Sequence, residues 1–194
     1  MLENLNEDQR AAVTTTQGPL LVLSGAGTGK TRVLTTRIAY ILEQNLAMPW
    51  QVLALTFTNK AANEMKARIT AFGTEGEFNA RDLWCGTFHS VALRILRANA
   101  DAAGLRRDFI VFGDDDQKAV IKNILASLGM SVKTPADYVD QFSSVKDRGL
   151  RALEYKDKIF DAYNAELARL NAVDFGDIIL KVLQLFDTNP DILA

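Results

Sequence analysis

The chain has 194 residues, enough for one large domain or two small ones, and its 48% apolar and 24% charged residues are typical of a globular protein. Its single cysteine excludes an intrachain disulfide, its single histidine argues against a histidine-based metal cluster or catalytic triad, and its formal net charge of −2 gives no general attraction to nucleic acid. Because no apolar run is long enough to span a membrane and the start of the chain has no signal-peptide pattern, we expect a cytoplasmic protein with no membrane partner.

The first half of the chain alternates between predicted helices and predicted strands. Their expected order is helix 5–15, strand 19–23, helix 30–43, strand 52–56, helix 60–70, strand 83–85 and helix 90–98. Short apolar strands separated by helices indicate parallel strands joined by crossover helices. Such sheets bind their ligands at the carboxyl ends of the strands. We therefore predict an α/β domain over residues 1–100 with its site at that edge.

The second half, residues 101–194, is predicted to be nearly all helical, apart from residues 109–112. After a brief extended piece, apolar residues recur at helical spacing over 118–128, from Pro135 onward, over 159–170 and over 175–186. The acidic residues Asp114, Asp115 and Asp116 come just before the first of these helices, where negative charge suits the helix dipole. We therefore assign them to a helix start and not to a metal site.

The strand at 19–23 leads into a glycine-rich turn that ends in Gly-Lys-Thr. The turn consists of Ser24, Gly25, Ala26, Gly27, Thr28, Gly29, Lys30 and Thr31. Its glycines allow the backbone to bend around an anion with N–H groups pointing inward, and the following helix adds the positive end of its dipole. Lys30 can reach the β- and γ-phosphates of a nucleotide, and the Thr31 hydroxyl can hold Mg²⁺. The pattern predicts a site for ATP and Mg²⁺, with Ser24 in place of the usual first glycine.

Four further segments narrow the class of phosphate-loop protein. They are LNEDQRAAV at 5–13, TFTNKAANEM at 56–65, GTFH at 86–89 and VDFGD at 173–177. In this order and spacing they resemble motifs of the UvrD/Rep/PcrA-type superfamily 1 DNA helicases, and the resemblance covers nearly the whole chain. It implies a RecA-like P-loop NTPase fold, a parallel sheet with helices on both faces (subdomain 1A, incomplete, 1–100), followed by an all-helical inserted subdomain (1B, 101–194). The implied activity is ATP-dependent unwinding of duplex DNA, with 3′-to-5′ movement, in DNA repair or replication.

The resemblance also implies nucleotide contacts in the first domain. It implies that Gln9 reads adenine, since an amide can donate and accept hydrogen bonds at once, and that Arg32 lies beside the nucleotide with the phosphate loop. It implies catalytic roles for Lys30 and Thr31. The residues alone leave two alternatives open: Gln9 can close a capping box with Asn6, and Arg32 can lie on a solvated helix face.

Two groups of residues at strand ends resemble the single-strand contacts of this family. They are Phe57, Asn59 and Lys60 after the second strand, and Thr87, Phe88 and His89 after the third. An aromatic ring can stack on a base of any sequence, and Lys and Asn side chains can hold phosphates. The resemblance therefore implies single-stranded and duplex DNA as partners. The alternatives are structural: a buried Phe57 with Asn59 as a helix cap, and His89 as a hydrogen-bonded residue of the fold.

Helicases of this family need further parts that this sequence does not carry. These are an Asp-Glu pair that holds Mg²⁺ and activates water, and an arginine finger in a second motor domain. The segment 113–117 imitates one of their late acidic motifs, and Asp174 and Asp177 lie on a helical pattern, so we assign neither to that role. We expect an N-terminal fragment whose partner is the rest of the helicase chain and which is not catalytically competent alone. The alternatives are a helicase–nuclease subunit, a small-molecule kinase and a non-catalytic nucleotide-binding module.

Overall fold

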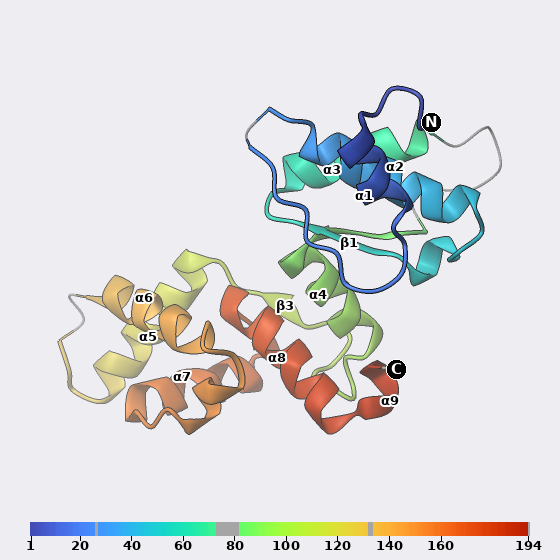
Figure 1. The fold of residues 1–194 in the computed structure, drawn as a ribbon. Helices are drawn as coiled ribbons and strands as arrows, with labels where there is room; N and C mark the ends of the chain where they lie inside the picture. The colour runs from blue at the N-terminus through green and yellow to red at the C-terminus, as the bar shows by residue number, and fades with distance from the viewer. Residues whose placement is uncertain (26, 73–81, 132–133, 194) are drawn as a thin grey trace. The chain divides into compact units, whose positions relative to one another are not determined.

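The computed structural model describes residues 1–25, 27–72, 82–131 and 134–193. The chain divides into two compact units, Met1–Val91 and Ala92–Ala194 (Figure 1). The first unit is built of helices and a parallel pair of strands, and the second is mostly helical. Both contain a small parallel sheet, so the chain is a helix-rich α/β protein.

In the first unit, helices precede and connect two parallel strands. Its elements are α1 (Glu7–Thr14), α2 (Lys30–Glu43), a 3₁₀ turn (Pro49–Gln51), β1 (Leu53–Thr56), α3 (Asn59–Thr70), β2 (Trp84–Thr87) and the start of α4 (Phe88–Ala98). The two strands pair with Leu53 opposite Trp84 and Thr56 opposite Thr87. These elements confirm the predicted helices, and the predicted second and third strands, to within a few residues.

The core of the first unit lies between the sheet and the helices α2 and α3. It consists of Ile38, Leu42, Ala54, Met65, Ile69, Leu83 and Cys85, all of them buried. Residues four apart, such as Ile38 and Leu42, share one face of a helix, and this apolar face of α2 is turned toward the sheet. α1 packs against α2 through Val13 and Val33. Figure 1 shows α1, α2 and α3 gathered on the same side of β1.

The strand predicted at 19–23 does not form. Residues 19–25 have no regular secondary structure, and Leu21 and Leu23 are 80% and 84% exposed. A strand is stabilised by hydrogen bonds to a neighbouring strand and by burial of its side chains. Among the described residues, the sheet of the first unit consists of β1 and β2 alone and does not include this segment. The larger sheet with helices on both faces is therefore not seen in the described part of the chain.

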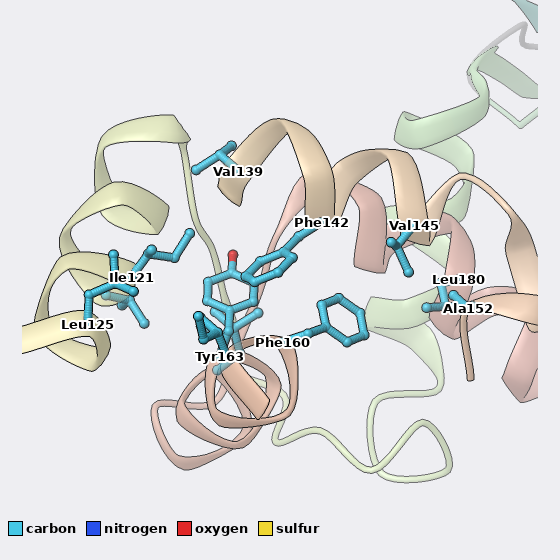
Figure 2. Packing of buried hydrophobic residues seen from close by; sticks show 13 residues of the cluster. Ile121, Leu125, Val139, Phe142, Val145, Ala152, Phe160, Tyr163 and Leu180 are labelled. Atoms are coloured by element: carbon cyan, nitrogen blue, oxygen red, sulfur yellow. The ribbon is translucent and has the colours of Figure 1, made fainter. Parts of the chain in front are cut away.

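In the second unit, helices surround a buried aromatic cluster. The elements after α4 are β3 (Ile110–Val111), α5 (Asp114–Ser127), α6 (Pro135–Lys146), a 3₁₀ turn (Gly149–Glu154), α7 (Lys158–Arg169), β4 (Ala172–Val173), α8 (Phe175–Thr188) and α9 (Pro190–Leu193). The ring of Phe142 on α6 lies 5.0 Å from that of Phe160 and 5.3 Å from that of Tyr163, measured between centroids (Figure 2). Ile121 and Leu125 of α5 belong to the same cluster. The helices predicted from apolar spacing are confirmed.

The second unit is not all-helical, because β3 and β4 form a short parallel ladder. Ile110 lies opposite Ala172 in this ladder. The residue before β4 holds the two segments together: the side-chain oxygen of Asn171 accepts from the Arg106 N–H at 2.9 Å, and its amide donates to Asp108 at 3.0 Å. A two-residue strand is too short for an alternating apolar pattern, so the sequence could not predict β4.

A buried ion-pair cluster joins α6, α7 and α8. The side chain of Lys146 is 1% exposed, and its ammonium lies 2.5 Å from Asp174 and 2.8 Å from Asp177 at the start of α8. Each carboxylate also accepts a hydrogen bond from the backbone N–H of the other aspartate, which caps the helix. The Tyr163 hydroxyl donates to Asp174 at 2.9 Å. These aspartates therefore serve the structure of the second unit.

Candidate functional site

The glycine-rich turn curls back on itself before α2 begins. Gly27 and Gly29 have φ angles of +76° and +90°, a backbone region that residues with a side chain rarely adopt. The Thr28 hydroxyl donates to the Gly25 carbonyl at 2.8 Å and closes the turn. Gly29 is the N-cap of α2, so the positive end of the helix dipole lies at the turn. Ala26, also predicted as part of this site, lies outside the described residues.

Lys30 lies across the turn that precedes it. Its ammonium donates hydrogen bonds to the carbonyls of Ser24 at 2.9 Å and of Gly25 at 2.7 Å. Phosphate oxygens are charged and accept such hydrogen bonds more strongly than carbonyls do, so an ammonium placed here can exchange one set of partners for the other. The positive end of the helix dipole and the Lys30 ammonium make the surroundings of this turn favourable for an anion.

Gln9 lies beside this turn, although it is 19 residues before Thr28. Its side-chain nitrogen donates to the Thr28 carbonyl at 3.1 Å, and its side-chain oxygen accepts from the Asn6 N–H at 3.2 Å. The capping box is therefore present, and it coexists with the proximity to the phosphate loop that the resemblance implies. Gln9, Ser24, Thr28 and Lys30 line one cavity of about 190 Å³.

The lining of this cavity does not include Thr31 or Arg32, nor the glycines of the turn. Thr31 is exposed in the first turn of α2, where its hydroxyl offers a single oxygen to a metal ion. Arg32 lines a different cavity, of about 330 Å³, together with Arg68 and Phe72. The described ranges hold no group of three or more His, Cys, Asp or Glu side chains that could bind a metal. The structure thus brings Gln9 to the phosphate loop, and Gln9 and Arg32 both lie near Gly29: a Cβ atom there would be 3.3 Å from the Gln9 nitrogen and 3.9 Å from the Arg32 Cβ.

The carboxyl ends of β1 and β2 carry two neighbouring aromatic rings, Phe57 and Phe88, which we call the aromatic pair. The strands are parallel with Thr56 opposite Thr87, so the residues that follow them reach the same edge of the sheet. The ring centroids are 5.9 Å apart, with 44° between the ring planes. Phe57 is 90% exposed and Phe88 is 47% exposed. The alternative of a buried Phe57 is therefore wrong.

The helix α3 begins at this edge with a cap that the sequence analysis did not assign. The Thr58 hydroxyl accepts from the Ala61 N–H at 3.2 Å, so Thr58 and not Asn59 is the N-cap. Asn59 and Lys60 occupy the first positions of the helix, and both are exposed. Their side chains and the positive end of the helix dipole make this edge favourable for an anion.

The helix α4 begins at the same edge, directly after β2, whose residue Gly86 lies close to the first turn of the helix. A Cβ atom at Gly86 would lie 2.4 Å from the Ser90 hydroxyl oxygen, too close for any other residue to fit without a shift. The Thr87 hydroxyl accepts from the Ser90 N–H at 3.2 Å, and His89 is half-buried in the first turn. The residues predicted to contact single-stranded DNA thus lie together at one edge of the sheet. Their role in binding DNA stays a prediction.

The acidic segment after β3 is a helix start, as predicted. Asp114, Asp115 and Asp116 form the first turn of α5, and Asp116 accepts from the Gly113 N–H at 3.0 Å. Asp115 lies 3.6 Å from Lys118 within the same helix. Asp115 and Asp116 therefore have partners within α5 or at its N-cap, and all three carboxylates lie at the positive end of its dipole.

A comparison with protein families places these features in a known group. The family model described as the UvrD/REP helicase N-terminal domain matches residues 5–194. The chain therefore belongs to the UvrD/REP helicase family. In the ranges that the structure describes, we find no helix that combines the length and the apolar character needed to cross a membrane.

Individual relatives agree with the family match. The ATP-dependent DNA helicase PcrA of Leuconostoc citreum is 39% identical to this chain, that of Staphylococcus epidermidis is 41% identical, and that of Staphylococcus aureus is 40% identical. Each alignment covers the whole of this chain but only 27% of the first relative and 28% of the other two. The chain thus spans little more than a quarter of the length of these relatives.

Proposed function

We propose that this chain is the ATP-binding and single-strand-binding N-terminal part of an ATP-dependent 3′-to-5′ DNA helicase that acts in DNA repair or replication. The observation that carries the proposal is the aromatic pair at the carboxyl edge of the sheet, in the same compact unit as the phosphate loop. A phosphate loop alone fits many classes of protein, including small-molecule kinases. An aromatic ring that is 90% exposed, as Phe57 is, contributes little to packing and suits stacking on a base.

The nucleotide part of the proposal rests on the glycine-rich turn and on Gln9. We assign the phosphates of ATP to the turn, with Lys30 leaving the Ser24 and Gly25 carbonyls for the β- and γ-phosphates. We assign the adenine to the cavity that Gln9 lines. Thr31 provides a ligand for Mg²⁺, which when bound neutralises phosphate charge. Arg32 lines another cavity, but its Cβ would lie 3.9 Å from a Cβ atom at Gly29, so we keep its assignment beside the phosphate loop as a proposal.

We assign residues 1–100 to an incomplete RecA-like motor domain and residues 101–194 to its helical insertion. The parallel pairing of β1 with β2 supports the first assignment, and the exposed apolar segment at 20–23 is suited to pair with further strands. The relatives are much longer than this chain, and we place the acidic pair, the arginine finger and the second motor domain in their remaining length. On this assignment the chain binds ATP and DNA without turning ATP over by itself.

We assign single-stranded DNA to the edge of the sheet that carries the aromatic pair. Bases stack on Phe57 and Phe88, while Asn59, Lys60 and the starts of α3 and α4 face the phosphates. Stacking and phosphate contacts do not read base sequence, which suits a motor that moves along any DNA. His89, in the first turn of α4, lies at the same edge.

The proposal is tested by measuring oligothymidine binding and ATP binding in parallel on Phe57→Ala and Trp50→Ala. Trp50 is the matched control, because it is a 62% exposed aromatic before the amino end of β1, whereas Phe57 follows the carboxyl end. One stacked base contributes about 1–3 kcal/mol, so Phe57→Ala should weaken single-strand binding by about 5- to 150-fold and leave ATP binding unchanged. Trp50→Ala should change neither. If Phe57→Ala and the unchanged chain bound oligothymidine with equal affinity, the assignment of single-stranded DNA to this edge would be overturned.

A further inference from the structure

The side-chain amide of Gln9 lies between the start of α1 and the phosphate loop, and its two ends can be told apart. The backbone N–H of Asn6 can only donate, so the atom 3.2 Å from it is the Gln9 oxygen. The Thr28 carbonyl can only accept, so the atom 3.1 Å from it is the Gln9 nitrogen. The amide is therefore held in one of its two orientations, with Oε1 toward α1 and Nε2 toward the loop.

Asn6 holds Gln9 through two hydrogen bonds. It is the N-cap of α1, and its side-chain oxygen accepts from the Gln9 backbone N–H at 2.8 Å. Its own backbone N–H then meets the Gln9 side-chain oxygen as that side chain folds back. At the other end of the amide, a Cβ atom at Gly29 would lie 3.3 Å from the Gln9 nitrogen, so glycine leaves room for the amide above the loop.

These contacts use half of the hydrogen-bonding capacity of the amide. A glutamine amide has two N–H donors and two acceptor lone pairs, and Asn6 and Thr28 each occupy one of them. One donor and one acceptor remain for the cavity of about 190 Å³ that Gln9 lines. On the edge that carries N7, adenine presents a donor beside an acceptor, whereas guanine presents two acceptors. The remaining groups of Gln9 therefore match adenine and set an oxygen against guanine O6.

We propose that Asn6 is a positioning residue that favours adenine over guanine by fixing the orientation of the Gln9 amide. The inference rests on the proposed ATP site and adds to it Asn6, which lines the same cavity as Gln9 and acts on the base through the Gln9 amide. An amide turned by half a rotation would set its nitrogen against the N6 donor of adenine and its oxygen against N7, so it would no longer match adenine. Guanine, with two acceptors, meets the amide oxygen with one of them in either orientation, so fixing the amide favours adenine alone. The Asn6 N–H holds the Gln9 Oε1, and the Asn6 side-chain oxygen accepts from the Gln9 backbone N–H and so keeps the residue in place. Together with the Thr28 carbonyl at Nε2, these contacts hold the amide in the orientation that matches adenine.

The test compares the dissociation constants of ATP and GTP, measured by calorimetry at a fixed Mg²⁺ concentration, for the unchanged chain and three variants. Asn6→Asp keeps both the capping oxygen and the backbone N–H. Asn6→Ala removes only the capping oxygen. Asn6→Pro also removes the N–H, and the proline ring fits the φ of −70° at this position.

We expect the unchanged chain and Asn6→Asp to prefer ATP equally. Asn6→Ala should lose about twofold to fivefold of that preference and Asn6→Pro about tenfold, because one lost hydrogen bond weakens binding by amounts of this order. Equal weakening of ATP and GTP in the Ala and Pro variants would mean a purely structural cap and would overturn the proposal, as would an unchanged preference in Asn6→Pro. Binding of both nucleotides without preference by the unchanged chain overturns it but leaves the proposed function standing. If the unchanged chain binds neither ATP nor GTP, both the proposal for Asn6 and the proposed function are overturned.

Discussion

Replacing Lys146 by methionine is expected to destabilise the second unit by about 3–5 kcal/mol near neutral pH, because two buried carboxylates lose their cation. The ammonium lies 2.5 Å from Asp174 and 2.8 Å from Asp177, whose side chains are 4% and 8% exposed. The stem of Lys146 packs closely on α8: a Cβ atom at Gly176 would lie 2.9 Å from the Lys146 Cβ. Methionine keeps an unbranched stem, so the substitution changes charge far more than packing.

The loss of stability should shrink in acid. Burial already raises the pKa of the Asp177 carboxyl above its ordinary value, and removal of the neighbouring ammonium raises it further. In the folded variant Asp177 therefore binds a proton at a pH where the same carboxyl in the unfolded chain is still charged. By linkage, the stability of the variant rises as the pH falls toward the ordinary carboxyl pKa and is lost as the pH rises through the folded-state pKa.

Urea unfolding followed by circular dichroism, at about pH 7 and about pH 5, measures both effects. Lys122→Met removes an exposed cation from the same unit and should change stability by less than about 0.5 kcal/mol. A triple variant that adds Asp174→Asn and Asp177→Asn should recover most of the loss, since neutral amides can still cap α8. A loss below about 1 kcal/mol in Lys146→Met, or a loss that grows in acid, would refute this reasoning.

Three further results are expected. Gly29→Ala should weaken ATP binding, because at φ +90° the new Cβ would lie 3.3 Å from the Gln9 nitrogen and displace the amide. Gly18→Ala, at φ +73° in open space, should cost about 1–2 kcal/mol of stability and leave calorimetric ATP binding unchanged. Equal ATP affinities of the Gly29→Ala and Gly18→Ala variants would count against the Gln9 contact. Burial and the nearby Asp174 raise the pKa of the Tyr163 hydroxyl well above its ordinary value, so alkaline absorbance titration should show Tyr163 ionising only on unfolding, with stability falling above about pH 10. Ionisation of all four tyrosines in the native state would disprove this. Asp115→Ala should not alter Mg²⁺–ATP binding, since Asp115 lies beside Lys118 in α5, and a large loss would place the acidic segment in the nucleotide site.

The helices and the aromatic pair could be predicted from the sequence because their signals are local. α2 runs from Lys30 to Glu43 as its apolar spacing predicts, and α1 begins after the predicted N-cap Asn6. Phe57 and Phe88 could be expected to meet, because each follows a strand and parallel strands bring their carboxyl ends to one edge.

The remaining features depend on contacts between distant residues, which no local pattern reveals. The segment 19–23 has the composition of a strand, but strand formation also needs a neighbouring strand. The hydrogen bond from Gln9 to Thr28 joins residues 19 positions apart, and the ion pair of Lys146 with Asp174 joins residues 28 positions apart. The apolar spacing of helices and strands is a pattern over a few turns of chain, so it cannot predict contacts between residues this far apart.

ATP binding by this chain tests the central claim most directly. Mg²⁺–ATP is titrated calorimetrically into the unchanged chain, Lys30→Ala and the exposed-lysine control Lys122→Ala. We predict that the unchanged chain and Lys122→Ala bind ATP with the same affinity and that Lys30→Ala shows no measurable binding, because the ammonium over the loop is lost. Equal ATP affinity in all three proteins would mean that the glycine-rich turn is not the nucleotide site. This result would contradict the proposed function of the chain.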